Sequence, residues 1–251
     1  MKEDIQHFIK KFKNEPIEVL LAHFLKLYDD RIMLASSLGV EDQVLTDMVL
    51  KINPKARIFV LDTGRLHQET YEVMSETRVQ YNMNYEVFFP EAKAVENMLN
   101  AHGPNLMYES YDNRRLCCTI RKVEPLARAL KTCDAWITGL RREQSPARSN
   151  HEIIEYDSVH DNVKLNPLIE WTTDQIWEYI KTHDVPYNTL HDNGYPSIGC
   201  VPCTRAINRG DDLRAGRWWW EKETQKECGI HFEDGKMVKD TPKDDGLIGG
   251  E

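Results

Sequence analysis

The sequence has no apolar run of about 18 residues, which is the length a helix needs to cross a membrane. Its first residues, MKEDIQHFIKKFKNEP, also lack the apolar region of a secretory signal peptide. Cysteine is scarce, because six in 251 residues are too few for a secreted disulfide scaffold and favour metal binding or catalysis in a reducing compartment. These absences predict a cytoplasmic protein with no membrane partner.

The chain also lacks an excess of positive charge. Its formal net charge of −9 argues against broad nucleic-acid binding. Arginines and lysines nevertheless cluster locally, which favours a small anionic ligand in a pocket, although solvated charged faces would give the same pattern. The clusters are Arg114, Arg115, Arg121 and Lys122; Arg141, Arg142 and Arg148; and Arg205, Arg209, Arg214 and Arg217.

The sequence has no internal repeats. Short apolar segments typical of strands alternate along it with amphipathic segments typical of helices. A helix is expected over residues 4–28, and strands over 31–37, 56–64, 84–90 and 134–140, with a further strand–helix unit from KLNPLIEW and Thr172 or Thr173 as helix cap. The alternation predicts an α/β fold with a mostly parallel sheet and helices on both faces. The pattern fades near residue 205, so we expect an α/β nucleotide-binding domain over 1–205 and a mobile C-terminal arm over 206–251.

Neither a P-loop nor a G-x-G-x-x-G motif is present, yet three polar turns follow the predicted strands. They are SSLGVED (36–42), DTGRLHQET (62–70) and TGLRREQSPARS (138–149). Ligands of open parallel sheets bind at the carboxyl ends of the strands, where these turns should lie. Ser36, Ser37 and Gly39 could bind phosphate oxygens before a helix start. Asp62 could bind a ribose hydroxyl or cap the next helix, and His67 is ambiguous in the same way.

Four cysteines form two short-range pairs, Cys117–Cys118 and Cys200–Cys203. Two thiolate pairs are typical of zinc or an iron–sulfur centre. Structural zinc normally uses C-x₂₋₄-C spacing, whereas a [4Fe–4S] cube can take adjacent cysteines on different irons, so adjacency favours the cluster over zinc. Cys133 is expected to be a packed core thiol. Cys228, in KECGIHF, is a candidate nucleophile or an incidental surface thiol.

Taken together, these segments resemble one enzyme family in order and in sequence, over roughly residues 32–232. The matching pieces are SSLGVEDQVL, LDTGRLHQETY, CCTIRKVEPL, WITGLRREQSPARS, KLNPLIEW, GCVPCTR, GRWWWE and ECGIH. The chain resembles the assimilatory adenylylsulfate (APS) reductases, the cluster-containing branch of the PAPS/APS reductase family. Relatives without a cluster keep the E-C-G-x-H ending but not the other four cysteines.

The resemblance implies an adenine nucleotide alpha hydrolase-like fold and a thioredoxin-dependent reduction of APS to sulfite and AMP in sulfate assimilation. Cys117, Cys118, Cys200 and Cys203 match the ligands of a [4Fe–4S] cluster, and Cys228 matches the nucleophile that forms an S-sulfocysteine. Further positions match phosphosulfate contacts, or lie in loops similar to those around the adenosine. They are Lys122, Arg214, Arg217 and His231 for the phosphosulfate, and Ser36, Ser37, Gly39, Asp62, Gly64, Arg141 and Arg148 for the adenosine.

Three other functions are compatible with parts of this pattern. A PAPS or dual-specificity reductase would use the same chemistry on a 3′-phosphorylated substrate. An ATP-dependent tRNA sulfurtransferase would share the nucleotide-binding sheet, but the acidic net charge disfavours an RNA partner. A cluster-bearing sensor or binding module would have no use for Cys228. The expected partners are therefore APS and thioredoxin or a similar dithiol, and the sequence allows a homo-oligomer.

Overall fold

The computed structural model describes residues 5–145 and 148–221. Its centre is a six-stranded sheet with the order β3-β2-β1-β4-β6-β5. Strands β3, β2, β1, β4 and β6 are parallel, and β5 pairs antiparallel with β6 at one edge. The strands are β1 (Ile32–Ser36), β2 (Arg57–Leu61), β3 (Glu86–Phe88), β4 (Ala135–Ile137), β5 (Ile154–Asp157) and β6 (Asn162–Leu165). The predicted α/β class and mostly parallel sheet are confirmed.

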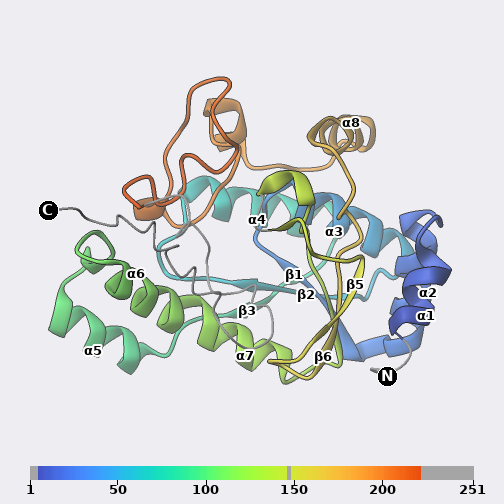
Figure 1. Cartoon of the computed structure of the whole chain (residues 1–251), viewed down its shortest axis with the longest axis horizontal. Helices are drawn as coiled ribbons and strands as arrows, with labels where there is room; N and C mark the ends of the chain where they lie inside the picture. Colours follow the sequence, from blue (N-terminus) through green and yellow to red (C-terminus); the bar gives the residue numbers. More distant parts are fainter. Residues whose placement is uncertain (1–4, 146–147, 222–251) are drawn as a thin grey trace, which may run out of the picture.

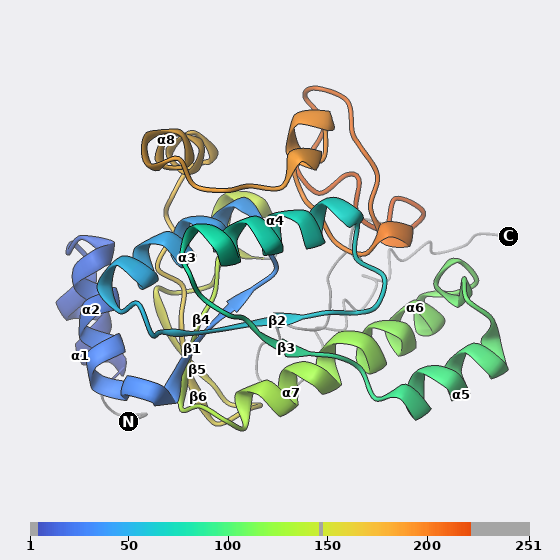
Figure 2. The ribbon, with the colours of Figure 1, turned by 180° about the vertical axis from the view of Figure 1, so that it is seen from behind.

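Helices cover both faces of the sheet, as Figures 1 and 2 show. One face carries α1 (Ile5–Phe12), α2 (Ile17–Tyr28), α3 (Val40–Ile52) and α4 (Gln68–Gln80), with α8 (Thr173–His183) packed outside α3. The other face carries α7 (Glu124–Leu130). The helices that precede it in the chain, α5 (Ala92–His102) and α6 (Tyr111–Cys118), lie at one end of the molecule. Each face has its own apolar core, around Leu20, Leu34 and Val44 on the first and around Phe59 and Trp136 on the second.

Two local features differ from the sequence prediction. The single helix expected over residues 4–28 is two helices, because Pro16 lies at the N-cap of α2 and cannot continue a hydrogen-bonded turn from α1. Strand β5 was not predicted. Its pattern is polar on one side, as expected for an edge strand, and its partner β6 follows after a short turn through Asp161. The predicted cap Thr172 is confirmed, with its hydroxyl accepting from Gln175 N.

A π-helical turn, Thr119–Val123, joins α6 to α7 directly after the adjacent cysteines. Pro125 lies near the start of α7 and has no N–H to donate to the carbonyl four residues earlier, which favours a wider turn here. The turn carries Arg121 and Lys122. Within the described residues, no helix is both long enough and apolar enough to span a bilayer.

Candidate functional site

A cavity of about 240 Å³ lies at the carboxyl ends of β1, β2 and β4. Parallel strands place their following loops at one edge of the sheet, so turns distant in sequence meet there. The described segment after α8 closes the cavity from the opposite side through Ser197, Gly199 and their neighbours. Eight residues predicted to contact substrate line it: Ser36, Ser37, Gly39, Lys122, Arg141, Arg148, Arg214 and Arg217.

Two of the predicted residues lie outside the lining of this cavity. Asp62 accepts hydrogen bonds from Gly64 N at 2.8 Å and from the Tyr71 hydroxyl at 2.9 Å. Asp62 does not cap the next helix, because the N-cap of α4 is His67. Asp62 instead holds its own turn, in which Gly64 takes a left-handed φ of 69°. Cys228 and His231 lie outside the described residues.

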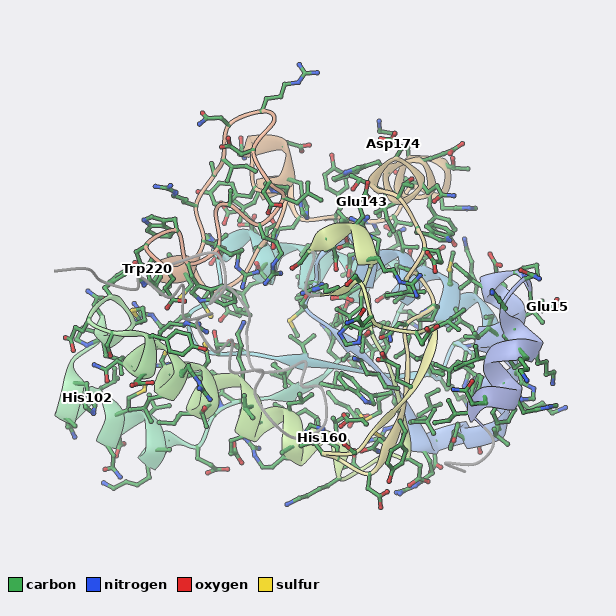
Figure 3. All side chains as sticks on the ribbon, in the orientation of Figure 1. Glu15, His102, Glu143, His160, Asp174 and Trp220 are labelled. Carbon is green, nitrogen blue, oxygen red and sulfur yellow. The ribbon has the colours of Figure 1, made fainter. Side chains whose placement is uncertain are left out.

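The side chain of Arg141 is already fully engaged by protein groups. Its guanidinium pairs with Glu41 at 2.8 Å and Glu143 at 2.7 Å and donates to Thr173 Oγ1 and Trp171 O. The residue is only 3% exposed. Figure 3 shows Glu143 on a short turn beside α8. The hydrogen bonds of Arg141 and Glu143 to Thr173 connect the start of α8 to the wall of the cavity. Arg141 therefore shapes the cavity wall.

One residue that the sequence reasoning missed organises the first turn. The Asp42 carboxylate accepts from Ser37 N at 2.7 Å and from Ser37 Oγ at 2.6 Å. Burial raises the pKa of Asp42 to about 6, although the hydrogen bonds from Ser37 oppose the shift. A Cβ at Gly139 would meet Asp42 Oδ1 at 2.4 Å, so glycine allows the loop after β4 to approach the first turn of α3. The sequence does contain a signal for this role, which is an acidic residue in the first turn of the helix that follows the two serines.

Several contacts hold Arg217 at the cavity wall. It donates to Ser197 Oγ at 3.1 Å and to Ile198 O at 3.3 Å, and its backbone forms a β-bridge with Thr204. The guanidinium lies over the Trp218 ring at 4.7 Å. These contacts fix a buried cation, 7% exposed, where the cavity approaches the cysteines.

The four paired cysteines converge in one packed cluster that also contains Trp218 and Met107. Thr63 Oγ1 and Cys200 Sγ are 3.2 Å apart, within hydrogen-bond distance. Burial raises the pKa of the Cys203 thiol to about 12, while the positive charges of Lys122 and Arg217 act in the opposite direction. The cysteine cluster and the anion cavity are thus electrostatic neighbours, joined by two cations that line the cavity.

The donor set can be compared with known metal centres. Four thiols from two chain segments are the ligand chemistry of zinc and iron–sulfur sites. All five described cysteines are free of disulfides. In the described part of the chain, no group of three or more His, Cys, Asp or Glu side chains is placed so that it could hold a metal ion. Cys133 is 4% exposed in the core beneath α7, as expected for a packed thiol.

The sequence reasoning did not assign roles to the polar neighbours of the cysteines. Arg121, 7% exposed, donates to Thr63 O at 2.5 Å and so ties the π-helical turn to the loop after β2. Thr63 itself is fully buried. Arg121 was noted only as part of a basic cluster, and Thr63 gave no signal because its partner Cys200 is 137 positions away.

Comparisons with known proteins agree with this arrangement. Residues 31–206 match the model of the phosphoadenosine phosphosulfate reductase domain. An adenosine 5′-phosphosulfate reductase of Burkholderia cepacia is 48% identical over 220 residues, which cover 88% of each chain. The enzyme of the same name from Allochromatium vinosum is 47% identical over 202 residues, covering 80% of this chain and 79% of that one.

Solved structures show the same fold. A phosphoadenylyl-sulfate reductase from Candida auris, in a phosphate complex, superposes with a TM-score of 0.69 at 26% identity, covering 80% of this chain and 96% of that one. An FMN adenylyltransferase from Candida glabrata superposes with a TM-score of 0.54 at 16% identity, covering 86% of this chain and 73% of that one. The second likeness concerns the fold alone.

Proposed function

This chain belongs to the phosphoadenosine phosphosulfate reductase family, and from that premise we propose that it reduces adenosine 5′-phosphosulfate to sulfite and AMP. The observation that carries the proposal is the cavity, which is lined by Lys122, Arg214 and Arg217. Lys122 and Arg217 act electrostatically on Cys203, and Arg214 lies over the ring of Trp218, which packs with the four cysteines. A substrate with a phosphate and a sulfate needs such cations in an otherwise acidic protein. Relatives at 42–48% identity bear the name of that activity.

The proposed reaction has two displacements at sulfur. The Cys228 thiolate attacks the sulfur of APS, and the bond from sulfur to the phosphate oxygen breaks so that AMP leaves with the electron pair. A thiolate of thioredoxin or a similar dithiol then attacks the Cys228 sulfur and expels sulfite. Its second thiol resolves the mixed disulfide, so the dithiol is oxidised by two electrons and Cys228 returns to a thiol.

The described residues contribute to the first displacement through charge and position. The cations of Lys122, Arg214 and Arg217 would stabilise the negative charge that develops on the leaving phosphate oxygen. The same cations favour the thiolate form of an approaching Cys228. Of the arm predicted over 206–251, the described residues 206–221 contribute Arg214 and Arg217 to the cavity wall. In this proposal the chain beyond Glu221 brings Cys228 to the substrate and then presents it to the reductant.

We also propose that Cys117, Cys118, Cys200 and Cys203 hold a [4Fe–4S] cluster. The residue types fit, because four thiols from two segments lie in one packed cluster beside Thr63 and Arg121, although the described side chains are not placed around a common metal position. When bound, the cluster would supply a fixed charge next to the cavity, since the two displacements already account for both electrons. Lys122, which lines the cavity and acts electrostatically on Cys203, would link the two sites.

Substrate labelling tests the activity. Protein incubated with APS labelled at sulfur, without any reductant, should retain label that Cys228→Ser abolishes. Cys133→Ser is the matched control, because Cys133 is buried beneath α7 and away from the cavity lining, so this variant should keep the label. Label that survives in Cys228→Ser would refute the mechanism.

Reduction of PAPS is the second candidate, because the Candida auris structure carries that name. The comparison is direct: kcat/KM is measured for substrates with and without a 3′-phosphate. A large preference for the substrate without it supports APS, and the reverse preference supports PAPS.

A further inference from the structure

Arg114 and Glu221 form a buried ion pair that joins two distant parts of the chain. Arg114 Nε donates to Glu221 Oε1 and Arg114 Nη2 donates to Glu221 Oε2, both at 2.9 Å. Their side chains are only 1% and 5% exposed. Because desolvation makes burying two charges costly, a pair in this position is kept only where good geometry compensates, and removing one partner leaves an uncompensated charge.

Aromatic rings enclose the guanidinium on α6. It lies 4.7 Å from the centre of the Trp218 ring and 5.0 Å from that of Tyr111. Burial by itself would lower the pKa of Arg114, but hydrogen bonds to Glu221 and Cys118 and their charges hold the pKa above its usual value. Arg114 therefore contacts a proposed cluster ligand, Cys118, and the far end of the described chain, Glu221.

The chain around Glu221 is held from both sides. Glu221 N donates to Trp218 O at 2.8 Å, and Trp218 N donates to Cys203 O at 3.2 Å. Trp218 has a φ of 42°, a left-handed conformation that a bulky residue adopts only where its surroundings impose it. Figure 3 shows the neighbouring Trp220 at the end of the molecule where α5 and α6 lie. The turn is thus fastened both to the loop of Cys203 and to the helix of Cys118.

We propose that Arg114 is a positioning residue: through Glu221 it fixes the point from which the chain continues to Cys228, and it links that point to the cysteine cluster. Cys228 is seven residues beyond Glu221, so its reach from this point is at most about 25 Å at about 3.5 Å per residue. An ordered cysteine site then fixes the point on the protein from which the segment carrying Cys228 extends. This inference rests on the proposed function, in which Cys228 attacks the substrate.

Glu221→Gln in the full-length protein tests the anchor, because it keeps the size of the side chain and removes its charge. Limited trypsin digestion should cut after Lys222 at least about tenfold faster, since cleavage follows local opening of the structure. In single turnover, transfer of label from APS to Cys228 should slow about two- to tenfold, while the Kd of AMP and the iron content remain unchanged. The lower bound is the fall in effective concentration when the tether lengthens from seven residues, counted from Glu221, to about eleven, counted from Arg217 at the cavity wall.

Glu86→Gln is the matched control. It removes the charge from another bidentate pair, in which Arg57 Nε and Nη2 donate to Glu86 at 2.6 and 2.9 Å on β2 and β3. This variant should leave cleavage after Lys222 and the rate of transfer unchanged. Equal acceleration of cleavage in both variants would show a general loss of stability and would overturn the proposal.

The link to the cysteine site is tested by removing iron with a chelator. Chelation should accelerate cleavage after Lys222 in the wild-type protein, and much less in Glu221→Gln, where the anchor is already lost. The positioning role would be refuted if chelation and Glu221→Gln accelerated cleavage independently, each by its full factor. It would also be refuted if Glu221→Gln transferred label at the normal rate despite faster cleavage. A protein that takes no label from APS in any form would instead refute the proposed function, and the comparison of Glu221→Gln with Glu86→Gln by cleavage would still decide on the anchor.

Discussion

Replacing Gly199 with alanine should weaken binding of the anionic substrate, although none of the side chains proposed to bind the substrate is replaced. A Cβ at this position would lie 2.4 Å from Nη2 and 2.7 Å from Cζ of Arg217. The guanidinium must therefore leave the position in which it donates to Ser197 Oγ and Ile198 O. A hydrogen bond to a charged group contributes about 1.5–3 kcal/mol, so kcat/KM for APS should fall roughly 10- to 150-fold.

The assay is steady-state kinetics with APS, together with the Kd of AMP and the iron content. Iron content is measured because Gly199 precedes Cys200, and the prediction requires it to remain normal. Arg217→Ala supplies the second arm of a double-mutant cycle. If Gly199 acts through Arg217, Gly199→Ala should cost little in the Arg217→Ala background. The same loss in both backgrounds would refute the argument.

Two further predictions concern charges around the cavity. Lys122→Ala should slow formation of the S-sulfocysteine far more than it lowers iron content, and equal losses in single-turnover labelling and iron analysis would make Lys122 merely structural. Asp42 has a folded pKa of about 6 against an ordinary 3.8, so its ionisation destabilises the folded protein by about 3 kcal/mol at pH above 6 and by nothing below pH 4. The free energy of unfolding of Asp42→Asn relative to wild type should therefore rise as pH increases from 4 to 6 in urea titrations, and a constant difference would contradict the buried-carboxylate interpretation.

Much of the fold could be predicted because the buried strands have a local signature. β1, β2 and β4 are short apolar runs that break at small polar residues, and the core around Leu34 and Phe59 covers both faces of the sheet. The break at Pro16 was visible in the sequence but was outweighed by the apolar periodicity on either side. Strand β5 could not be predicted, since an edge strand with one polar side looks like a loop until its partner is known.

The candidate site was predictable to the extent that its chemistry depends on residue type. Paired cysteines and clustered arginines predict a thiolate site and an anion site, because these residue types occur at short spacing. The individual assignments were less secure, because they depend on neighbours. Asp62 holds its own turn, and Arg141 is engaged by Glu41 and Glu143. Neither outcome can be inferred from the motif in which the residue occurs.

The sequence alone therefore determined the class of the fold, the two pairs of thiols and the surplus of cations near them, since each depends on which residues occur at short spacing. The tertiary structure decided which of them meet. Cys117 and Cys200 come together only because α6 and the segment after α8 pack against each other, and Arg114 finds Glu221 across 107 positions for the same reason. Contacts at that separation arise from packing of whole elements, for which no local pattern exists.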